Sequence, residues 1–292
     1  MIVRKIFCGL TNCLGLCFHD IKVSLISIFV VQILINIFNI LAIFYVPFYK
    51  SKRSWYRRHG IYSVIEIYQS IFPYIIQTFL IAKSYLMRNQ QKFLSEKLKP
   101  KFTQKIGKCE KNFLIRVLVI ILIRITKFIW GRSKTSIIFN SHTTFPELIY
   151  SSNDLMFVYY VELLIEYLEY INYKIQMMRT KNDMKIIKRE IYEVFVLKRK
   201  ILERYSMDIF ITISFHFLVL IISFYWVIMR LLFNLLKRFD DFATFLYFIE
   251  PIFIYWIMFS KCEEFYSKVI SKLILNLVSN SHLIFFSLSS WN

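Results

Sequence analysis

Glycine and proline are scarce in this sequence, with only five of each among 292 residues. No glycine follows Gly131, and only Pro146 and Pro251 interrupt the rest of the chain. So few turn-forming residues exclude a collagen-like chain and argue against a barrel, which needs many short strands joined by turns. Long helices fit this composition, and the expected fold class is all-α.

Sequence patterns that carry catalysis or bind metal are also missing. The five histidines are scattered, and there is no His-Glu-x-x-His, Cys-x-x-Cys or glycine-rich phosphate loop. The five cysteines all fall in segments that we expect on the cytoplasmic side of a membrane, so we expect reduced thiols and not a disulfide scaffold. We therefore expect a protein that is not an enzyme and that holds no metal or cofactor.

Apolar side chains, in contrast, are abundant. Hydrophobic residues make up 57% of the chain, aromatic residues 18%, and the mean hydropathy is +0.50. An ordinary soluble domain is about 45–50% apolar even when glycine is counted. A soluble monomer would have to expose the excess to water, which such proteins rarely do. The composition predicts a membrane protein.

Six long apolar stretches are expected to cross the bilayer as helices, each of which needs roughly 20 residues. These spans are residues 23–46, 61–86, 113–130, 155–171, 209–233 and 242–259. They predict one polytopic helical bundle over the whole chain, with residues 260–292 as a cytoplasmic helix and tail. Three glutamates interrupt the fourth span, so an amphipathic helix at the membrane surface stays open as an alternative there.

The charge distribution predicts the orientation of this bundle. The chain carries 38 Lys and Arg against 19 Asp and Glu, a formal net charge of +19. In a soluble protein this excess suggests nucleic acid, whereas in a membrane protein it marks the cytoplasmic side. Most basic residues fall in the N-terminal segment, after the second span, between the fourth and fifth spans and in the tail. We expect a multi-pass plasma-membrane protein with a cytoplasmic N-terminus, whose partner is the lipid bilayer and not nucleic acid.

Residues 182–205 lie on the expected cytoplasmic side and have apolar residues near helical spacing with no helix breaker. We expect them to continue the fourth span as an extended cytoplasmic helix and then to lead into the fifth span.

Two stripes of opposite charge are expected on the third and fourth spans. They consist of Arg116, Arg124 and Lys127 in the third span and Glu162, Glu166 and Glu169 in the fourth. Ionisable groups inside a membrane are costly and are usually paired or functional. We predict that the two spans pack through ion pairs, with Arg124 and Glu162 at matching depth. The alternative is that the glutamates line a wet cavity while Arg124 and Lys127 reach outward to the lipid headgroups.

Aromatic and polar side chains gather at the expected outer ends of several spans. An apolar pocket with a few convergent polar groups is the usual form of a small-molecule site. The candidate ligand-binding residues are Tyr68, Gln69, Asp154, Tyr160, Tyr225, Trp226, Tyr247 and Glu250. The alternative is an aromatic belt, because Tyr and Trp collect at membrane interfaces regardless of function.

Three stretches resemble the insect gustatory receptors. SSNDLMFVYYVELLIEYLEYINYKI (residues 151–175) is similar to their fourth span, and residues 188–226 look like their cytoplasmic helix and fifth span. SKCEEFYSKVISKLILNLVSN, followed by FFSL, resembles the helix that leads toward their last span. The resemblance implies a receptor for a small-molecule tastant that works as a ligand-gated cation channel of four subunits, as a homo- or hetero-oligomer, with its pocket among the outer halves of the spans.

The last span of that family carries Thr-Tyr, a short apolar stretch and then Gln-Phe, and it lines the ion pore. No such motif occurs in this sequence. We therefore expect that the chain stops before the last span and that the pore helix is missing here. The alternatives to a receptor are a multi-span transporter with charges paired at mid-membrane and a non-conducting membrane scaffold or modulatory subunit.

Overall fold

The computed structural model describes residues 2–14, 29–41, 60–98, 103–130, 134–177, 180–232 and 238–269. Nearly all of these residues are helical and none lies in a strand, which confirms the all-α fold class. The labelled helices are α1 (Ile2–Cys13), α3 (Gly60–Leu86), α4 (Arg88–Leu98), α5 (Thr103–Trp130), α6 (Lys134–Gln176), α7 (Lys181–Leu232) and α8 (Arg238–Ser267). A further helix, Phe29–Leu41, lies between α1 and α3 in the chain.

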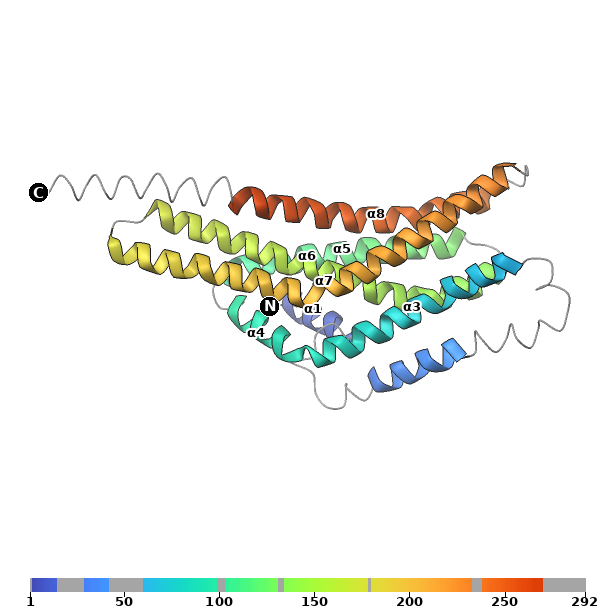
Figure 1. The fold of residues 1–292 in the computed structure, drawn as a ribbon, viewed down its shortest axis with the longest axis horizontal. Coiled ribbons are helices and arrows are strands. Elements are labelled where there is room, and N and C mark those ends of the chain that lie inside the picture. Colours follow the sequence, from blue (N-terminus) through green and yellow to red (C-terminus); the bar gives the residue numbers. More distant parts are fainter. Residues whose placement is uncertain are drawn as a thin grey trace, which may run out of the picture.

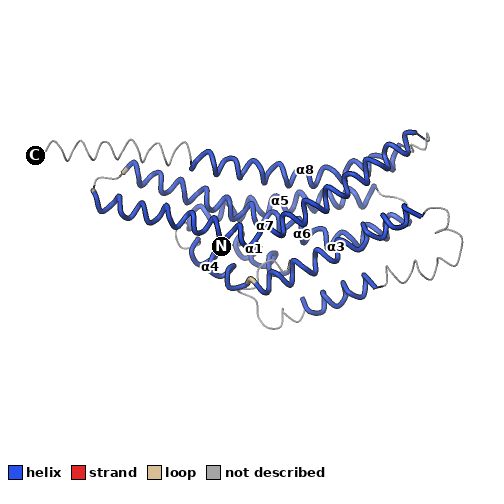
Figure 2. The backbone as a smooth tube through the Cα atoms, in the orientation of Figure 1, coloured by secondary structure: helices blue, strands red, loops and turns tan. Residues whose placement is uncertain are grey.

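The long helices lie side by side and alternate in direction (Figure 1). The turn between α6 and α7 lies at one end of the bundle, and the C-terminal end of α7 lies beside the start of α8 at the opposite end. The tube drawing shows how little of the described backbone is loop (Figure 2). The scarcity of glycine and proline thus corresponds to helices of up to 52 residues.

The boundary between α6 and α7 corrects one expectation. Residues 182–205 do not continue the fourth span, because α6 ends at Gln176 and α7 begins at Lys181. At this boundary Thr180 and Asp183 form a reciprocal cap, in which the Asp183 amide donates to Thr180 Oγ1 (3.2 Å) and the Thr180 amide donates to Asp183 Oδ2 (2.9 Å). The same residues do lead without a break into the expected fifth span, as the N-terminal half of α7.

Helix α6 is the central element of the bundle. It packs against α3, α5, α7 and α8, and every residue from 149 to 165 is buried. The main core includes Leu155 and Ile171 of α6 with Phe113 of α5, Leu197 of α7 and Ile254 of α8. An amphipathic helix at a membrane surface would leave one face exposed, so that alternative for the fourth span is wrong.

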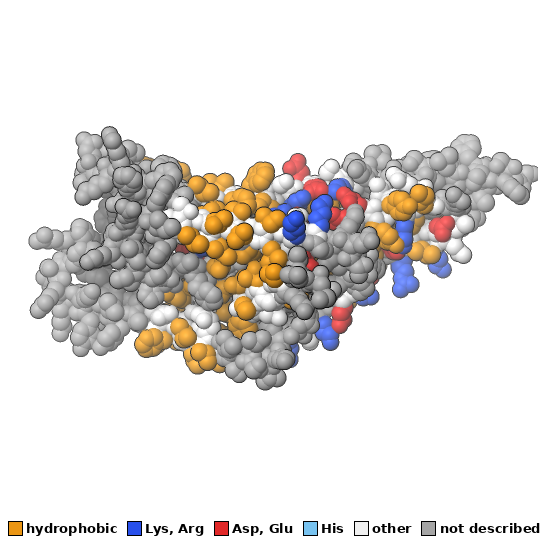
Figure 3. Space-filling model, turned by 180° about the vertical axis from the view of Figure 1, so that it is seen from behind, with side chains coloured by type: hydrophobic (Ala, Val, Ile, Leu, Met, Phe, Trp, Pro, Cys, Tyr) orange, Lys and Arg blue, Asp and Glu red, His pale blue; other side chains and the backbone are white. Residues whose placement is uncertain are grey.

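The outer surface of the bundle is unusually apolar. Large hydrophobic side chains are exposed on every outer helix, among them Phe38 (71% exposed), Leu122 on α5, Phe217 on α7 and Trp256 on α8 (68% exposed). Figure 3 shows apolar side chains as a broad orange area on one face of the bundle, bordered by charged side chains toward the end where α6 turns into α7. A surface of this kind is normally covered by another protein or by lipid.

By length and composition, one helical stretch among the described residues, Asn182–Ile221, could cross a membrane, and 33% of its apolar window is buried. Phe29–Leu41 and Ile71–Leu86 are apolar but shorter. Charged residues such as Arg116 in α5 and Glu162 in α6 interrupt the other long helices, and these charges lie against partners inside the bundle. The six membrane spans therefore stay a prediction.

Candidate functional site

The polar side chains of α6 between residues 149 and 165 are buried, because other helices cover this stretch on all sides. Burying such groups without a hydrogen-bond partner is destabilising. Most of them therefore contact a polar residue on a neighbouring helix, and the contacts form three groups. We name these groups after one member each: the Arg124 cluster, the Asp208 cluster and the Glu264 network.

The Arg124 cluster joins α5, α6 and α8. The guanidinium of Arg124 contacts the carboxylates of Glu147 on α6 and Glu250 on α8. It also donates to Ser151 Oγ (3.3 Å), which in turn donates to Glu250 (2.8 Å). Arg124 and Glu250 are only 6% and 2% exposed. One cation here faces two carboxylates at the centre of a three-helix contact.

The Asp208 cluster joins α3, α6 and α7. One oxygen of Asp208 lies 2.5 Å from Lys83 Nζ, and the other accepts from Arg204 (2.5 Å) and from the Asn153 amide (3.3 Å). A second nitrogen of Arg204 donates to Ser84 Oγ at 2.6 Å. Arg204 and Asp208 are fully buried, so each depends on the other for compensation of its charge.

The Asp208 cluster extends along α7 by a polar stripe at i, i+4 spacing: Arg204, Asp208, Thr212 and His216, all of them buried. Thr212 Oγ1 donates to Asp154 Oδ1 at 3.0 Å, and His216 Nδ1 contacts the hydroxyl of Tyr255 on α8. This stripe was not predicted from the sequence because it lies in and beside an apolar run. Its spacing is the signal that could have found it, since residues four apart share one helix face.

Several buried residues keep side-chain polar atoms with no hydrogen bond in the described part of the chain, among them Ser152 and Asn153 of α6. Gln77 on α3 leaves both amide atoms without a hydrogen bond, and Asp154 on α6 leaves Oδ2. The side chains of Gln77 and Asp154 are fully buried. Gln77 follows Ile76 in sequence, and Ile76 packs against α6 and α7 close to this level of the stripe. Buried polar atoms of this kind normally bind water or a ligand.

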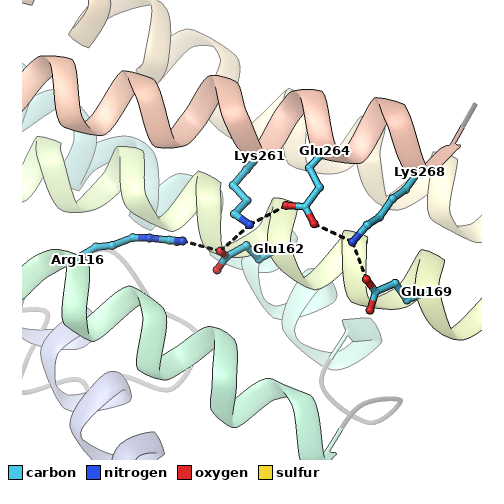
Figure 4. A network of polar contacts seen from close by, with 6 residues as sticks. All are labelled: Arg116, Glu162, Glu169, Lys261, Glu264 and Lys268. Atoms are coloured by element: carbon cyan, nitrogen blue, oxygen red, sulfur yellow. Dashed lines mark hydrogen bonds and ion pairs between the residues drawn. The ribbon is translucent and has the colours of Figure 1, made fainter. Parts of the chain in front are cut away.

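The Glu264 network ties α5 and α6 to the C-terminal half of α8 (Figure 4). Glu264 accepts from Lys261 and from Lys268, each at 2.7 Å. Lys268 also donates to Glu169 of α6 (2.6 Å), and Lys261 lies 3.8 Å from Glu162 of the same helix. The chain of contacts is completed on α5, whose Arg116 donates to Glu162 at 2.6 Å. Positive and negative groups thus alternate along three helices.

The predicted pairing of the two charged stripes occurs at Arg116 and Glu162 but not at Arg124. Arg124 pairs with Glu147 because α6 begins at Lys134, more than five turns before the expected start of the fourth span. The prediction that Arg124 and Glu162 lie at matching depth is therefore wrong. The outward reach predicted for Arg124 in the alternative is also wrong, since its guanidinium is buried.

The other members of the two stripes have different outcomes. Glu169 pairs with Lys268 of α8 and not with α5. Glu166 is half-buried. The Lys127 side chain lies outside the described residues.

The predicted ligand-binding residues do not form one group. Asp154 joins the polar stripe of α7, and Glu250 belongs to the Arg124 cluster. Tyr160 is buried among tyrosine rings of α6 and α7, whereas Tyr225 is 42% exposed on the outer surface. The side chains of the remaining four lie outside the described residues: Tyr68, Gln69, Trp226 and Tyr247.

Comparison of the chain with protein-family models, curated proteins and solved structures finds no match. Within the described residues, no group of three His, Cys, Asp or Glu side chains could hold a metal ion. A functional assignment therefore has to come from the buried polar groups, the apolar surface and the sequence patterns quoted above.

Reversing the charge of Glu162 tests the contact between α5 and α6. Glu162→Arg places a second cation beside Arg116, and breaking a buried pair in this way costs about 3–5 kcal/mol. We expect a lower thermal midpoint in detergent, and partial recovery when Arg116→Glu is added. Glu203→Arg is the control, because the pair with Arg199 (82% exposed) is on the surface and such pairs contribute about 0–1 kcal/mol. A double variant no more stable than Glu162→Arg would contradict the pairing.

The Glu264 network predicts an acid-sensitive contact between α8 and α6. Burial raises the pKa of the Glu264 carboxyl, but hydrogen bonds from Lys261 and Lys268 outweigh it and lower the pKa below its ordinary value of 4.5. A carboxyl with a lowered pKa contributes stability above its unfolded pKa and loses it as the pH falls through the folded value. We expect the thermal midpoint of the wild type to decrease as the pH is lowered below about 4.5. The decrease should be less steep in Glu264→Gln. The exposed neighbour Glu263→Gln should keep the wild-type slope; equal slopes in all three would refute the prediction.

Proposed function

We propose that this chain is a membrane-embedded chemoreceptor of the insect gustatory type, which detects a small molecule with polar groups inside its helix bundle. The observation that carries the proposal is the presence of unpaired polar atoms on buried residues, among them Gln77 and Asp154, within a bundle whose outer surface is apolar. A polar interior beneath an apolar surface suits a protein that lipid surrounds.

The proposed bundle crosses the bilayer six times, through the predicted span of residues 23–46, which contains the helix Phe29–Leu41, and through α3, α5, α6, α7 and α8. Exposed apolar side chains on the outer helices support this, because they would contact acyl chains. The charged residues of α5 and α6 are compatible with helices that span the membrane, because Arg116 and Arg124 are paired with glutamates inside the bundle. The excess of basic residues supports placing the α6–α7 turn and the N-terminus in the cytoplasm.

The proposed ligand site lies where α6 meets α3, α7 and α8, around Asp154, Thr212 and Gln77. A small molecule with hydroxyl or amide groups would pair with atoms that the protein leaves unpaired. Each of these unpaired atoms is destabilising by about 1–3 kcal/mol, which a bound ligand recovers. For signalling, the ligand must favour one arrangement of the helices over another, since equal affinity for both shifts nothing. By the family resemblance, the working unit is an oligomer that conducts cations.

The second candidate is a transporter, favoured by the charges of Arg124 and Glu250, which are paired and buried between helices that we expect to span the membrane. A transporter would accumulate its ligand in sealed vesicles, whereas a receptor would bind the ligand without moving it. A non-conducting scaffold or modulatory subunit would do neither alone.

Replacing Gln77 tests the proposed site. We expect Gln77→Leu to raise the thermal midpoint of the ligand-free protein in detergent, because it removes two unpaired buried polar atoms. The probes are sucrose, glucose, caffeine and quinine. At 100 times the dissociation constant, a binding probe should stabilise the wild type by about 2.7 kcal/mol, and this shift should be lost in Gln77→Leu.

Gln176→Leu is the matched control, because Gln176 is exposed at the end of α6. This variant should keep the ligand-induced shift of the thermal midpoint. A lower midpoint in Gln77→Leu, with the ligand-induced shift intact, would exclude this site. Uptake of the same probes into proteoliposomes would favour the transporter.

A further inference from the structure

The corner between α3 and α4 combines exposed apolar and exposed basic side chains. Only Met87 separates the two helices, and the backbone hydrogen bonds from Met87 to Lys83 (2.8 Å) and from Gln91 to Met87 (3.1 Å) span the joint. Leu86 is 78% exposed at the end of α3, and Tyr85 next to it is 38% exposed. The corner therefore projects apolar groups from the bundle at the point where the chain becomes strongly basic.

The inner face of α4 fixes the helix to the bundle. Leu94 and Leu98 are fully buried in the main core, and Gln91 beside them is 1% exposed. The outer face carries Arg88, Lys92 and Lys97, whose positions are set by that packing. This face is accordingly a rigid feature of the fold and not a loosely attached segment.

The positive charges of this face are poorly compensated. Arg88 stacks on the Tyr85 ring at 4.7 Å. Lys92 lies 3.9 Å from Glu96 and Lys97 lies 3.9 Å from Glu193, with both lysines more than half exposed. Contacts of that length and exposure are weak. Over residues 83–111 the sequence has nine Lys and Arg but only two Glu, and Glu110 is buried.

The corner also lies at the edge of the apolar surface. Lys83, in the last turn of α3, contacts Asp208 of α7, which sets the two helices in register. On α7 the exposed side chains from Met207 and Phe210 toward the C-terminal end are mostly apolar, whereas before Asp208 exposed apolar residues such as Tyr192 alternate with exposed Lys and Arg. Arg88 and Lys92 thus lie where the exposed surface changes from mostly apolar to mixed apolar and basic, which in the proposed embedding is the depth of the phosphate groups of a leaflet.

We propose that the α3–α4 corner, formed by Tyr85, Leu86, Arg88 and Lys92, binds the anionic headgroups of the surrounding lipid leaflet. The two cations would contact the phosphate and carboxylate oxygens of a lipid such as phosphatidylserine, and Leu86 and Tyr85 would contact the start of its acyl chains. Each Lys or Arg near an anionic membrane surface contributes about 1 kcal/mol of binding free energy. The proposal rests on the membrane embedding proposed above and adds a defined lipid contact to it.

The test uses the purified full chain in detergent micelles, titrated with phosphatidylserine or phosphatidylcholine and followed by native mass spectrometry. We expect tighter binding of phosphatidylserine in the wild type. In Arg88→Gln/Lys92→Gln this preference should fall by about tenfold or more, because two attractive charges are lost. Both side chains are exposed, so the variant should fold normally, which its thermal midpoint would verify.

The matched control removes the same charge from a distant part of α7, in Lys188→Gln/Arg189→Gln. These exposed residues lie roughly 30 Å along the helix from Asp208, beyond the reach of a headgroup held at the corner. The control should keep the wild-type preference. An equal loss in both double variants, or no loss in the α4 variant, would overturn the proposal.

A soluble headgroup separates a lipid site from a site for free anions. Glycerophosphoserine has the headgroup of phosphatidylserine but no acyl chains, so it should not compete at the concentration of the lipid. Competition as strong as that of the lipid would overturn the assignment to a leaflet. A failure of the membrane embedding itself would be recognised separately, since the wild type would then bind neither lipid.

Discussion

The structure depends on the burial of a polar helix. Along α6, residues 149–165 have no exposed face, although this stretch contains Asn153, Asp154 and Glu162. Polar groups so placed are stable only when a neighbouring helix supplies a partner. The contacts of Arg116 with Glu162 and of Asp208 with Asn153 meet this requirement. The polar contacts to buried residues of α6 therefore fix the register of the surrounding helices, in addition to apolar packing.

This requirement also explains where a ligand would act. The charged groups of the Arg124 cluster and the Asp208 cluster have partners of opposite charge within the bundle, whereas both amide atoms of Gln77 and Oδ2 of Asp154 have no hydrogen bond. In the proposed function, a molecule that pairs with those atoms would change the contacts of α3 and α6. The Glu264 network lies farther along α6 and connects it to α8. The proposed binding at one level of α6 would thus be connected, through one continuous helix, to ion pairs at another.

The all-helical fold followed from the scarcity of breakers, and one interhelical pair, Arg116 with Glu162, lay within the predicted stripes. The partner of Arg124 could not be predicted, because hydropathy placed the start of the fourth span at Leu155 while the helix begins at Lys134. The polar stripe of α7 was missed since hydropathy averages over faces, so single polar residues at i, i+4 disappear in an apolar run. In both cases the mean hydropathy of a stretch of sequence gave no information on which residues share one face of the helix.

The central claim, that lipid surrounds the bundle and α6 lies at its centre, can be measured by photolabelling from within the bilayer. The protein would be reconstituted with a diazirine-bearing phosphatidylcholine, irradiated, and mapped by peptide mass spectrometry. We predict label on exposed apolar residues such as Leu122, Phe217 and Trp256, and none on residues 149–165 of α6. Label on α6 as heavy as on α8, or no label on any helix, would contradict it.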